Sequence, residues 1–185
     1  DPNDILIMND PYTGGMHLPD IYVVVPITID TEKNTPFAYA VSVVHHVDVG
    51  GRAAGSMAHD STEIYQEGLR IPPLKLFDNG NLNKTLVDMI RQNVRPPDIV
   101  IGDIMGQVAA CRIGAKNMHA MVRQYGPETL QVYFDELRSY SERITRKIIS
   151  TWPNGIYQFT DYEMSFYSLY CFCILDIPYK KINNN

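Results

Sequence analysis

Two short segments of the chain concentrate the side chains that can do chemistry. Residues 9–20 contain His17 and Asp20, and residues 45–51 contain two adjacent histidines followed by Asp48. Three of the five histidines lie in these segments, which also carry two Gly-Gly pairs. Imidazole and carboxylate groups ligate catalytic divalent metals and act as general acids and bases. The clustering therefore predicts a metal centre or an acid–base site.

The spacing also limits how a metal could be held. A catalytic metal site commonly takes three protein ligands and leaves one position open for water. His17, Asp20 and one of His45 and His46 can supply that set. Successive residues of a strand point to opposite faces, so only one histidine of the pair can reach a given metal. The other histidine, or Asp48, would then orient ligands or transfer protons.

Two predicted strands border these segments. Residues 21–29 and 37–46 are rich in β-branched residues and are joined by the polar residues 31–35, which is the pattern of a β-hairpin. Antiparallel pairing would bring the two chemically rich segments together at one edge of the sheet. The run over 21–29 is apolar enough to be buried on both faces until Pro26 interrupts it. Residues 5–8 predict a further buried strand.

The middle of the chain predicts loops and one helix. The glycine- and alanine-rich residues 50–61 indicate an irregular loop over the same sheet edge. Asp60 could cap one helical turn, and Glu63 could complete a capping box. The Asp-Asn-Gly-Asn sequence over 78–81 is a strong turn signal, and residues 82–94 favour a helix.

Two longer helices follow. Apolar residues in steps of three and four predict a helix over 101–125, and a second stripe predicts another over 130–148. Gly126 and the proline after it end the first helix and begin the second. We expect an antiparallel helical hairpin, then a strand over 156–162.

These elements predict an α+β fold in one domain. A mixed or antiparallel N-terminal sheet with site loops is followed by a helical hairpin and a return strand. The predicted domain covers residues 1–163, and residues 164–185 form a divergent C-terminal tail. Because a buried strand arrives almost at once and no initiating Met precedes it, we expect a fragment of a longer polypeptide.

Composition excludes several classes of function. A net charge of −5 provides no basic surface for nucleic acid or an anionic membrane. No apolar run reaches the roughly 18 residues of a membrane span. Three cysteines make no disulfide framework, so we expect a reducing, cytoplasmic setting. Cys171 and Cys173 are more typical of small buried groups than of metal ligands.

Several motifs resemble the hydantoinase B/oxoprolinase family, and they occur in the family's order. Asn-Asp-Pro-Tyr-x-Gly-Gly-x-His-Leu-Pro-Asp lies at residues 9–20, and His-His-x-Asp-x-Gly-Gly at 45–51. Gly-Ser-Met follows at 55–57, and Ser-Thr-Glu-Ile-Tyr-Gln-Glu-Gly-Leu-Arg-Ile-Pro-Pro at 61–73. The similarity continues through residues 93–95, 102–114 and 140–143 and ends near residues 161–163.

The resemblance implies an N-methylhydantoinase B-like subunit of an enzyme that hydrolyses cyclic amides such as hydantoins or 5-oxoproline. A hydantoinase A-type partner subunit or domain would use ATP and phosphorylate the substrate, so we expect a hetero-oligomer. The B part would hold a divalent metal, Zn or Mn, that activates water. His17, Asp20 and His45 match the family's metal ligands. Three further residues lie in its motifs and are candidate catalytic residues: His46, Asp48 and Glu63.

Two alternatives accompany this hypothesis. A related acetone or acetophenone carboxylase-type subunit would join a phosphorylated enol to carbon dioxide, although the paired histidines and the Gly-Gly of residues 45–51 favour the hydrolase branch. The third possibility is a non-catalytic, truncated remnant that binds a metal or a partner without turnover. Residues 52–54, Arg-Ala-Ala, replace a proline-containing loop of the family, which favours the remnant.

Overall fold

A computed structural model describes residues 1–29, 35–153, 155–157, 160–163, 171–174 and 177–179, with side chains as far as residue 153. The chain divides into two compact units, residues 1–124 and 125–185, and both predicted chemical segments lie in the first unit. Most of the polar connection predicted at 31–35 lies outside the described residues.

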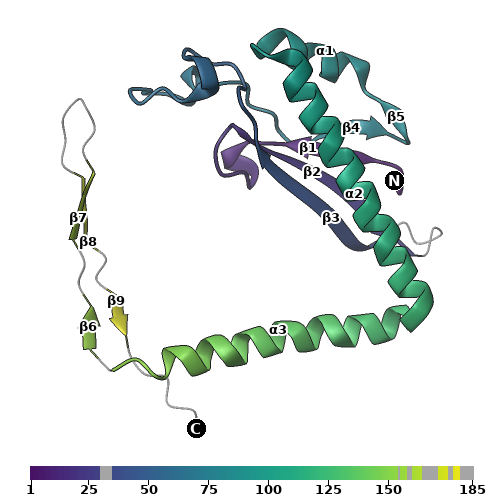
Figure 1. The fold of residues 1–185 in the computed structure, drawn as a ribbon, viewed down its shortest axis with the longest axis vertical. Helices are drawn as coiled ribbons and strands as arrows, with labels where there is room; N and C mark the ends of the chain where they lie inside the picture. Colours follow the sequence, from purple (N-terminus) through teal and green to yellow (C-terminus); the bar gives the residue numbers. More distant parts are fainter. Residues whose placement is uncertain (30–34, 154, 158–159, 164–170, 175–176, 180–185) are drawn as a thin grey trace. The chain divides into compact units, whose positions relative to one another are not determined.

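The first unit is built on a five-stranded antiparallel sheet (Figure 1). The strands run in the order β3-β2-β1-β4-β5, and neighbouring strands are antiparallel throughout. This arrangement confirms the predicted α+β fold and the predicted hairpin between the second and third strands. The strands are β1 (Ile5–Met8), β2 (Asp20–Thr28), β3 (Pro36–His45), β4 (Leu74–Asp78) and β5 (Asn81–Leu82).

Burial along β2 corrects one prediction. The strand alternates between buried and half-buried residues, so in this unit it has one covered face and not two. Its inward side chains, among them Ile21 and Val23, are almost fully buried. Pro26 does not interrupt the strand. β1 pairs with β2 only as far as Val24, so Pro26 lies where β2 has a partner on one side, and sheets accept proline at such positions.

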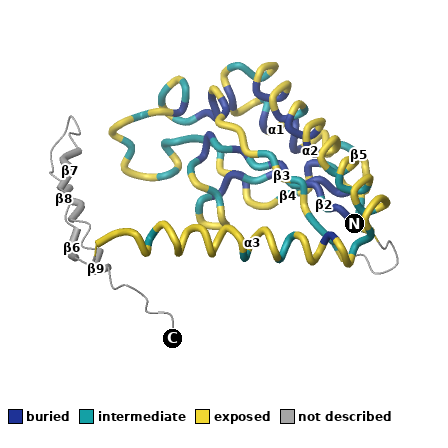
Figure 2. The backbone as a smooth tube through the Cα atoms, turned by 60° about the horizontal axis from the view of Figure 1, so that its bottom comes forward, coloured by how far each residue is buried: buried dark blue, intermediate teal, exposed yellow. Residues whose placement is uncertain are grey.

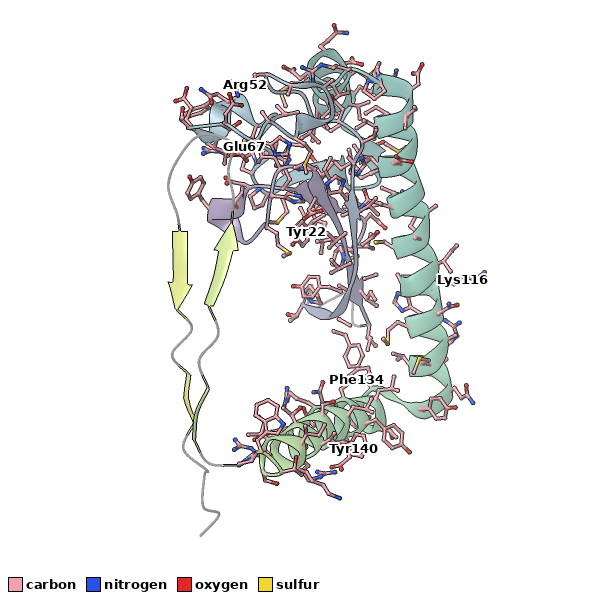
Figure 3. The ribbon with its side chains drawn as sticks, turned by 60° about the vertical axis from the view of Figure 1, so that its left-hand side comes forward. Tyr22, Arg52, Glu67, Lys116, Phe134 and Tyr140 are labelled. Carbon is pink, nitrogen blue, oxygen red and sulfur yellow. The ribbon has the colours of Figure 1, made fainter. Side chains whose placement is uncertain are left out.

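Two helices of the first unit, α1 (Lys84–Asn93) and α2 (Pro97–Tyr125), contribute to the core. Leu86 and Ile90 of α1 pack with Ile104 and Val108 of α2 and with the inward side chains of β1 and β2. The buried residues of α2 lie in its first half, while Lys116 points away from the sheet (Figures 2 and 3). The predicted apolar seam therefore covers the sheet with its N-terminal part.

The turn at residues 78–81 is confirmed, but the strands beside it are additional to the prediction. Asp78 pairs with Asn81, and Asn79 and Gly80 both have positive φ, as an Asn-Gly hairpin turn requires. The predicted helix begins only at Lys84, where the Asn83 side chain accepts a hydrogen bond from the Leu86 amide.

The second unit contains α3 (Pro127–Ile149), and Gly126 precedes it at φ 80°. Because α2 and α3 belong to different units, the predicted helical hairpin stays a prediction. The predicted return strand corresponds to two short strands, each paired with a strand of the predicted tail. They are β6 (Gly155–Tyr157) with β9 (Ile177–Tyr179), and β7 (Thr160–Glu163) with β8 (Cys171–Ile174).

Two further predictions concern the environment of the last two cysteines and the absence of a membrane span. The side chains of Cys171 and Cys173 lie outside them, so their environment stays a prediction. In the part of the chain that is described, no helix has the length and hydropathy needed to cross a membrane.

Candidate functional site

The candidate site forms at the open end of the β2–β3 hairpin. Asp20 is the first residue of β2 and His45 is the last residue of β3, and the two are direct partners in the antiparallel register. His17 lies in the tight turn before β2, where its carbonyl accepts a hydrogen bond from the Asp20 amide at 3.0 Å. The predicted meeting of the two segments at one edge of the sheet is therefore confirmed.

Side chains of this trio approach one another closely. His17 Nδ1 is 2.6 Å from Asp20 Oδ2, and the His17 and His45 rings are tilted by 54° with centroids 5.1 Å apart. His17 Nδ1 is buried, yet it makes no hydrogen bond of acceptable geometry with any described residue, Asp20 included. The ion-pair contact with Asp20 Oδ2 is thus the close polar contact of the buried His17 nitrogen.

The trio is not a finished metal site as its side chains stand. Among the described residues, no group of three or more His, Cys, Asp or Glu side chains has the arrangement of metal ligands. The His17 side chain is 45% exposed and that of Asp20 is 17% exposed. His45 is exposed as well, so both imidazoles have room to turn.

His46 lies in a different environment from its neighbour. It is fully buried against α2, where its Nε2 is 3.0 Å from Gln107 Oε1. Burial lowers the pKa of His46 below its ordinary value and so favours the neutral imidazole, although the Gln107 contact opposes this shift. The adjacent histidines are therefore divided between the core and the open site, as alternation along a strand requires.

Asp48 organises the loop that follows the hairpin. Its carboxylate accepts hydrogen bonds from the amides of Gly50, Gly55 and Arg95, and from the Arg95 guanidinium at 2.8 Å. Arg95 in turn donates to the carbonyl oxygens of Gly50, Gly51 and Ala53. Burial raises the pKa of the Asp48 carboxyl, but Arg95 and the backbone amides outweigh this effect and lower it. Asp48 is thus buried and occupied by structural contacts.

Glu63 is exposed, with extended backbone, immediately before the short 3-10 helix Ile64–Gln66. The predicted capping box at this point was wrong, because the Glu63 side chain caps no helix and Asp60 instead forms an ion pair with Arg52. Among the described residues, no hydrogen bond connects the Glu63 side chain to the histidines. Its predicted catalytic role therefore stays a prediction.

Asn9 joins the candidate site to a second loop. The side chain is completely buried, and its Nδ2 donates to the carbonyl oxygens of Leu18 at 2.7 Å and Leu69 at 2.9 Å. Its Oδ1 accepts a hydrogen bond from the Ile71 amide at 2.6 Å. The loop that carries His17 is therefore fixed to the segment around residue 70.

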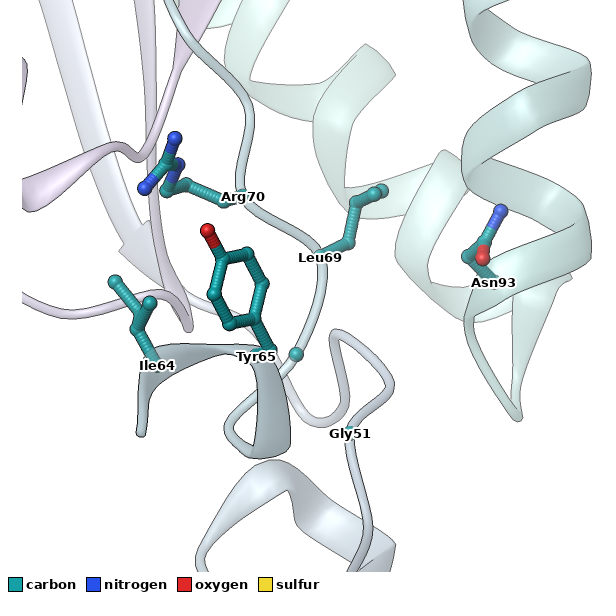
Figure 4. Close-up of a pocket in the computed structure, with 7 residues that line it drawn as sticks. Gly51, Ile64, Tyr65, Leu69, Arg70 and Asn93 are labelled. Atoms are coloured by element: carbon teal, nitrogen blue, oxygen red, sulfur yellow. The ribbon is translucent and has the colours of Figure 1, made fainter. Parts of the chain in front are cut away.

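That segment borders a cavity of about 440 Å³. Tyr65 and Arg70 both line it, the first with a phenol and the second with a guanidinium group (Figure 4). Arg70 is also placed over the Tyr12 ring, with its Nε 3.6 Å from Asp10 Oδ2. A guanidinium beside a hydroxyl can hold carbonyl, carboxylate or phosphate oxygens. The lining residues are Gly51, Ile64, Tyr65, Gly68, Leu69, Arg70 and Asn93.

Several residues of this region were missed by the sequence prediction. Arg95 and Gln107 bond to the site segment from 47 and 61 residues away along the chain, a distance that no local pattern reveals. Gln107 did carry a signal, because it is a polar residue within the apolar seam of α2. Asn9 and Arg70 belong to the family motifs at residues 9–20 and 61–73, but the spacing of these motifs did not predict a role for either side chain.

Asp48 generates a prediction about stability and pH. Replacing Asp48 with Asn should destabilise the protein by about 2 kcal/mol at pH 7, because the buried carboxylate loses its charge and with it the charged hydrogen bond from the partly exposed Arg95. A carboxyl whose folded-state pKa is lowered stabilises the fold above its unfolded pKa of about 4. The difference between wild type and variant should therefore shrink as the pH falls below about 4, measured by urea unfolding.

Asp98 provides the matched control. It pairs with Arg91 at 2.7 Å but is 89% exposed, so Asp98→Asn should change the free energy of unfolding by less than about 1 kcal/mol at any pH. Equal effects of the two substitutions would contradict the structural role of Asp48.

Comparisons with known proteins identify the family of the chain. The family model described as Hydantoinase B/oxoprolinase matches residues 1–175, beyond the point near residue 163 where we expected the resemblance to end. A relative from a Pseudomonas species, described as the B-type subunit of a D-/L-hydantoinase, is 35% identical over 155 residues, which are 83% of this chain and 26% of that protein.

Solved structures carry the same fold. The crystal structure of ATP-dependent caprolactamase from Pseudomonas jessenii matches 87% of this chain and 27% of its own, with 28% identity and a TM-score of 0.80. A nucleotide-free structure of acetone carboxylase matches 68% of this chain and 16% of its own, with 27% identity and a TM-score of 0.62. The chain spans about a quarter of the length of the hydantoinase relative, 26%, and 11% of the length of a 5-oxoprolinase from Dictyostelium discoideum. It belongs to the hydantoinase B/oxoprolinase family.

Proposed function

We propose that this chain is part of a subunit that hydrolyses cyclic amides in an ATP-dependent enzyme, with His17, Asp20 and His45 as ligands of a divalent cation. The observation that carries the proposal is the 2.6 Å approach of His17 Nδ1 to Asp20 Oδ2 beside the His45 ring. The printed functions of two relatives, a hydantoinase and an ATP-dependent caprolactamase, support an amide as the substrate.

The donor set suits such a cation. Two imidazole nitrogens and one carboxylate oxygen are common ligands of Zn²⁺, and Mn²⁺ also accepts them. The His17 Nδ1 and Asp20 Oδ2 atoms are already only 2.6 Å apart, so small movements of the two side chains would let both of them reach one cation. Turning the exposed His45 ring would complete the set, and the open side of the trio leaves space for water.

Each part of the site has a task in this proposal. When bound, a divalent cation would lower the pKa of a water toward about 7 and so supply the nucleophile. The pocket of Tyr65 and Arg70 would hold the oxygens of the substrate, and Asn9 would keep that pocket in register with His17. An amide resists attack by water because it is stabilised by resonance, so a hydantoinase A-type partner would first phosphorylate its oxygen with ATP.

The remaining candidates take different roles in this proposal. His46 and Asp48 are buried and satisfied by Gln107 and Arg95, which favours a supporting role over contact with the substrate. Glu63 is exposed and remains a candidate for proton transfer. We further propose a hetero-oligomer, since the hydantoinase relative is itself named as a subunit. The three cysteines, too few for a disulfide framework, favour a cytoplasmic location.

The carboxylase alternative rests on the acetone carboxylase structure, which shares the fold over 68% of this chain. The hydantoinase relative, which is 35% identical to this chain, and the caprolactamase structure favour hydrolysis. A non-catalytic remnant is the third possibility, and turnover distinguishes all three.

Metal content tests the ligand set. Purified protein should contain roughly one divalent ion per chain by elemental analysis, and His17→Ala or His45→Ala should lose it because only two ligands would remain. His59→Ala, which removes an exposed histidine outside the trio, should keep the ion. Unchanged metal content in both ligand variants would rule out the proposed site.

Turnover tests the reaction. With ATP and a hydantoinase A-type partner, the protein should open hydantoin, 5-oxoproline or caprolactam rings, followed as product formed per ATP consumed. The same assay with His17→Ala should form no product. Consumption of acetone or acetophenone with bicarbonate would instead support the carboxylase, and no consumption of either substrate class would support the remnant.

Arg70 tests the pocket. Arg70→Met should raise KM at least about tenfold, because a hydrogen bond to a charged group contributes about 1.5–3 kcal/mol. Arg112→Met is the matched control, since Arg112 also stacks on an aromatic ring, that of Phe77, but does not line the pocket. An equal KM in the two variants would show that the cavity does not bind the substrate.

A further inference from the structure

Gln107 is a buried polar residue in the middle of the apolar face of α2. It is only 3% exposed and lies next to Val108 of the core. Burying an amide is costly unless its donors and its acceptor are hydrogen-bonded. Gln107 meets this condition entirely through residues of the β2–β3 hairpin.

The hydrogen bonds of Gln107 define the orientation of its amide. Nε2 donates to the carbonyl oxygens of Ile21 at 2.9 Å and Ser42 at 3.2 Å. Carbonyl oxygens only accept, so the amide nitrogen must face them and Oε1 must face His46. His46 therefore donates from Nε2 at 3.0 Å and carries its proton there. Its Nδ1 then keeps a lone pair, and this buried atom has no hydrogen-bond partner among the described residues.

The partners of Gln107 flank the proposed ligands. Ile21 directly follows Asp20 on β2, and His46 directly follows His45, the last residue of β3. The backbone amide of His46 also donates to the Pro19 carbonyl at 2.8 Å. This hydrogen bond connects the segment between His17 and Asp20 to the end of β3. One side chain of α2 thus holds both strands of the hairpin at the end where Asp20 and His45 are paired.

We propose that Gln107 is a positioning residue for the cation site, and that it sets the spacing of Asp20 and His45 through the backbone and side chain of their neighbours. This inference rests on the proposed function. Gln107 itself packs from α2 against the covered face of the sheet and would not contact the cation. Its loss should loosen the hairpin end while the core beneath α2 remains.

Mn²⁺ alone is the probe for the test. Binding to the complete protein is titrated by electron paramagnetic resonance, in which free Mn²⁺ gives the signal that is followed. Gln107→Met, which keeps the length of the side chain but neither donates nor accepts a strong hydrogen bond, should weaken Mn²⁺ binding about tenfold, the lower end of the effect of supporting residues around metals. Gln107→Asn retains an amide with shorter reach and should weaken binding less.

A second measurement separates positioning from general destabilisation. Nitrogen-15 chemical shifts of His46 should report the Nε2-protonated tautomer in the wild type and a mixture of tautomers in Gln107→Met. Val108→Ala is the matched control, because it removes a buried contact one residue away without removing a hydrogen bond. It should lower the midpoint of urea unfolding yet leave both Mn²⁺ affinity and the His46 tautomer unchanged.

The outcomes are distinct. If the wild type binds no Mn²⁺, or if His17→Ala binds it equally well, the proposed function fails and the inference fails with it. If the wild type binds Mn²⁺ and Gln107→Met binds it with equal affinity, the inference alone is overturned. Should Gln107→Met not fold, equal affinity in Gln107→Asn overturns the inference, and weaker affinity than in Val108→Ala supports it.

Discussion

The pairing of Asp20 with His45 is the constraint on which the candidate site depends. Side chains alternate between the faces of a strand, so a slip of one residue would move one partner to the covered face. Ile21 and Val23 prevent that slip, because both are almost fully buried on the inward side of β2 and would be exposed by it. The apolar pattern of the hairpin therefore positions Asp20 and His45, although none of its apolar side chains is a candidate ligand.

Buried polar side chains fix the loops around this hairpin end. Asn9, Asp48 and Gln107 are each at most 5% exposed, and each bonds to backbone groups of separate segments. A buried backbone group without a partner costs about 1–3 kcal/mol, so one side chain that satisfies several such groups holds their segments together. Gly51 shows how tightly they pack, because a Cβ there would lie 2.6 Å from the Gln66 carbonyl oxygen. The loops owe their shape to these contacts and not to regular secondary structure.

Local patterns were sufficient for the hairpin, the Asn-Gly turn and the long helices, because strand alternation, turn chemistry and helical periodicity act over a few residues. They were not sufficient to predict how far the second face of β2 is buried. Tyr22 and Val24 are apolar, but in the described unit the core covers only the side of Ile21 and Val23. Arg95, which completes the Asp48 network from 47 residues away, could not be predicted because its partner is defined by the fold. Glu63 was assigned to a capping box on spacing alone, and an ion pair of Asp60 with Arg52 replaced that arrangement.

The two adjacent histidines give one motif two roles: one ring packs in the core, and the other lies at the candidate site. His45 ends β3 on the open face beside His17, and His46 follows it into the core beneath α2. Identical side chains thus acquire opposite environments from the two-residue period of a strand. The exposed imidazole retains a nitrogen for a ligand or a proton, while burial favours the neutral form of the other and Gln107 fixes its orientation. One additional residue between His45 and His46 would place both rings on the same face. The strand end could then no longer have one imidazole in the core and the other on the open face.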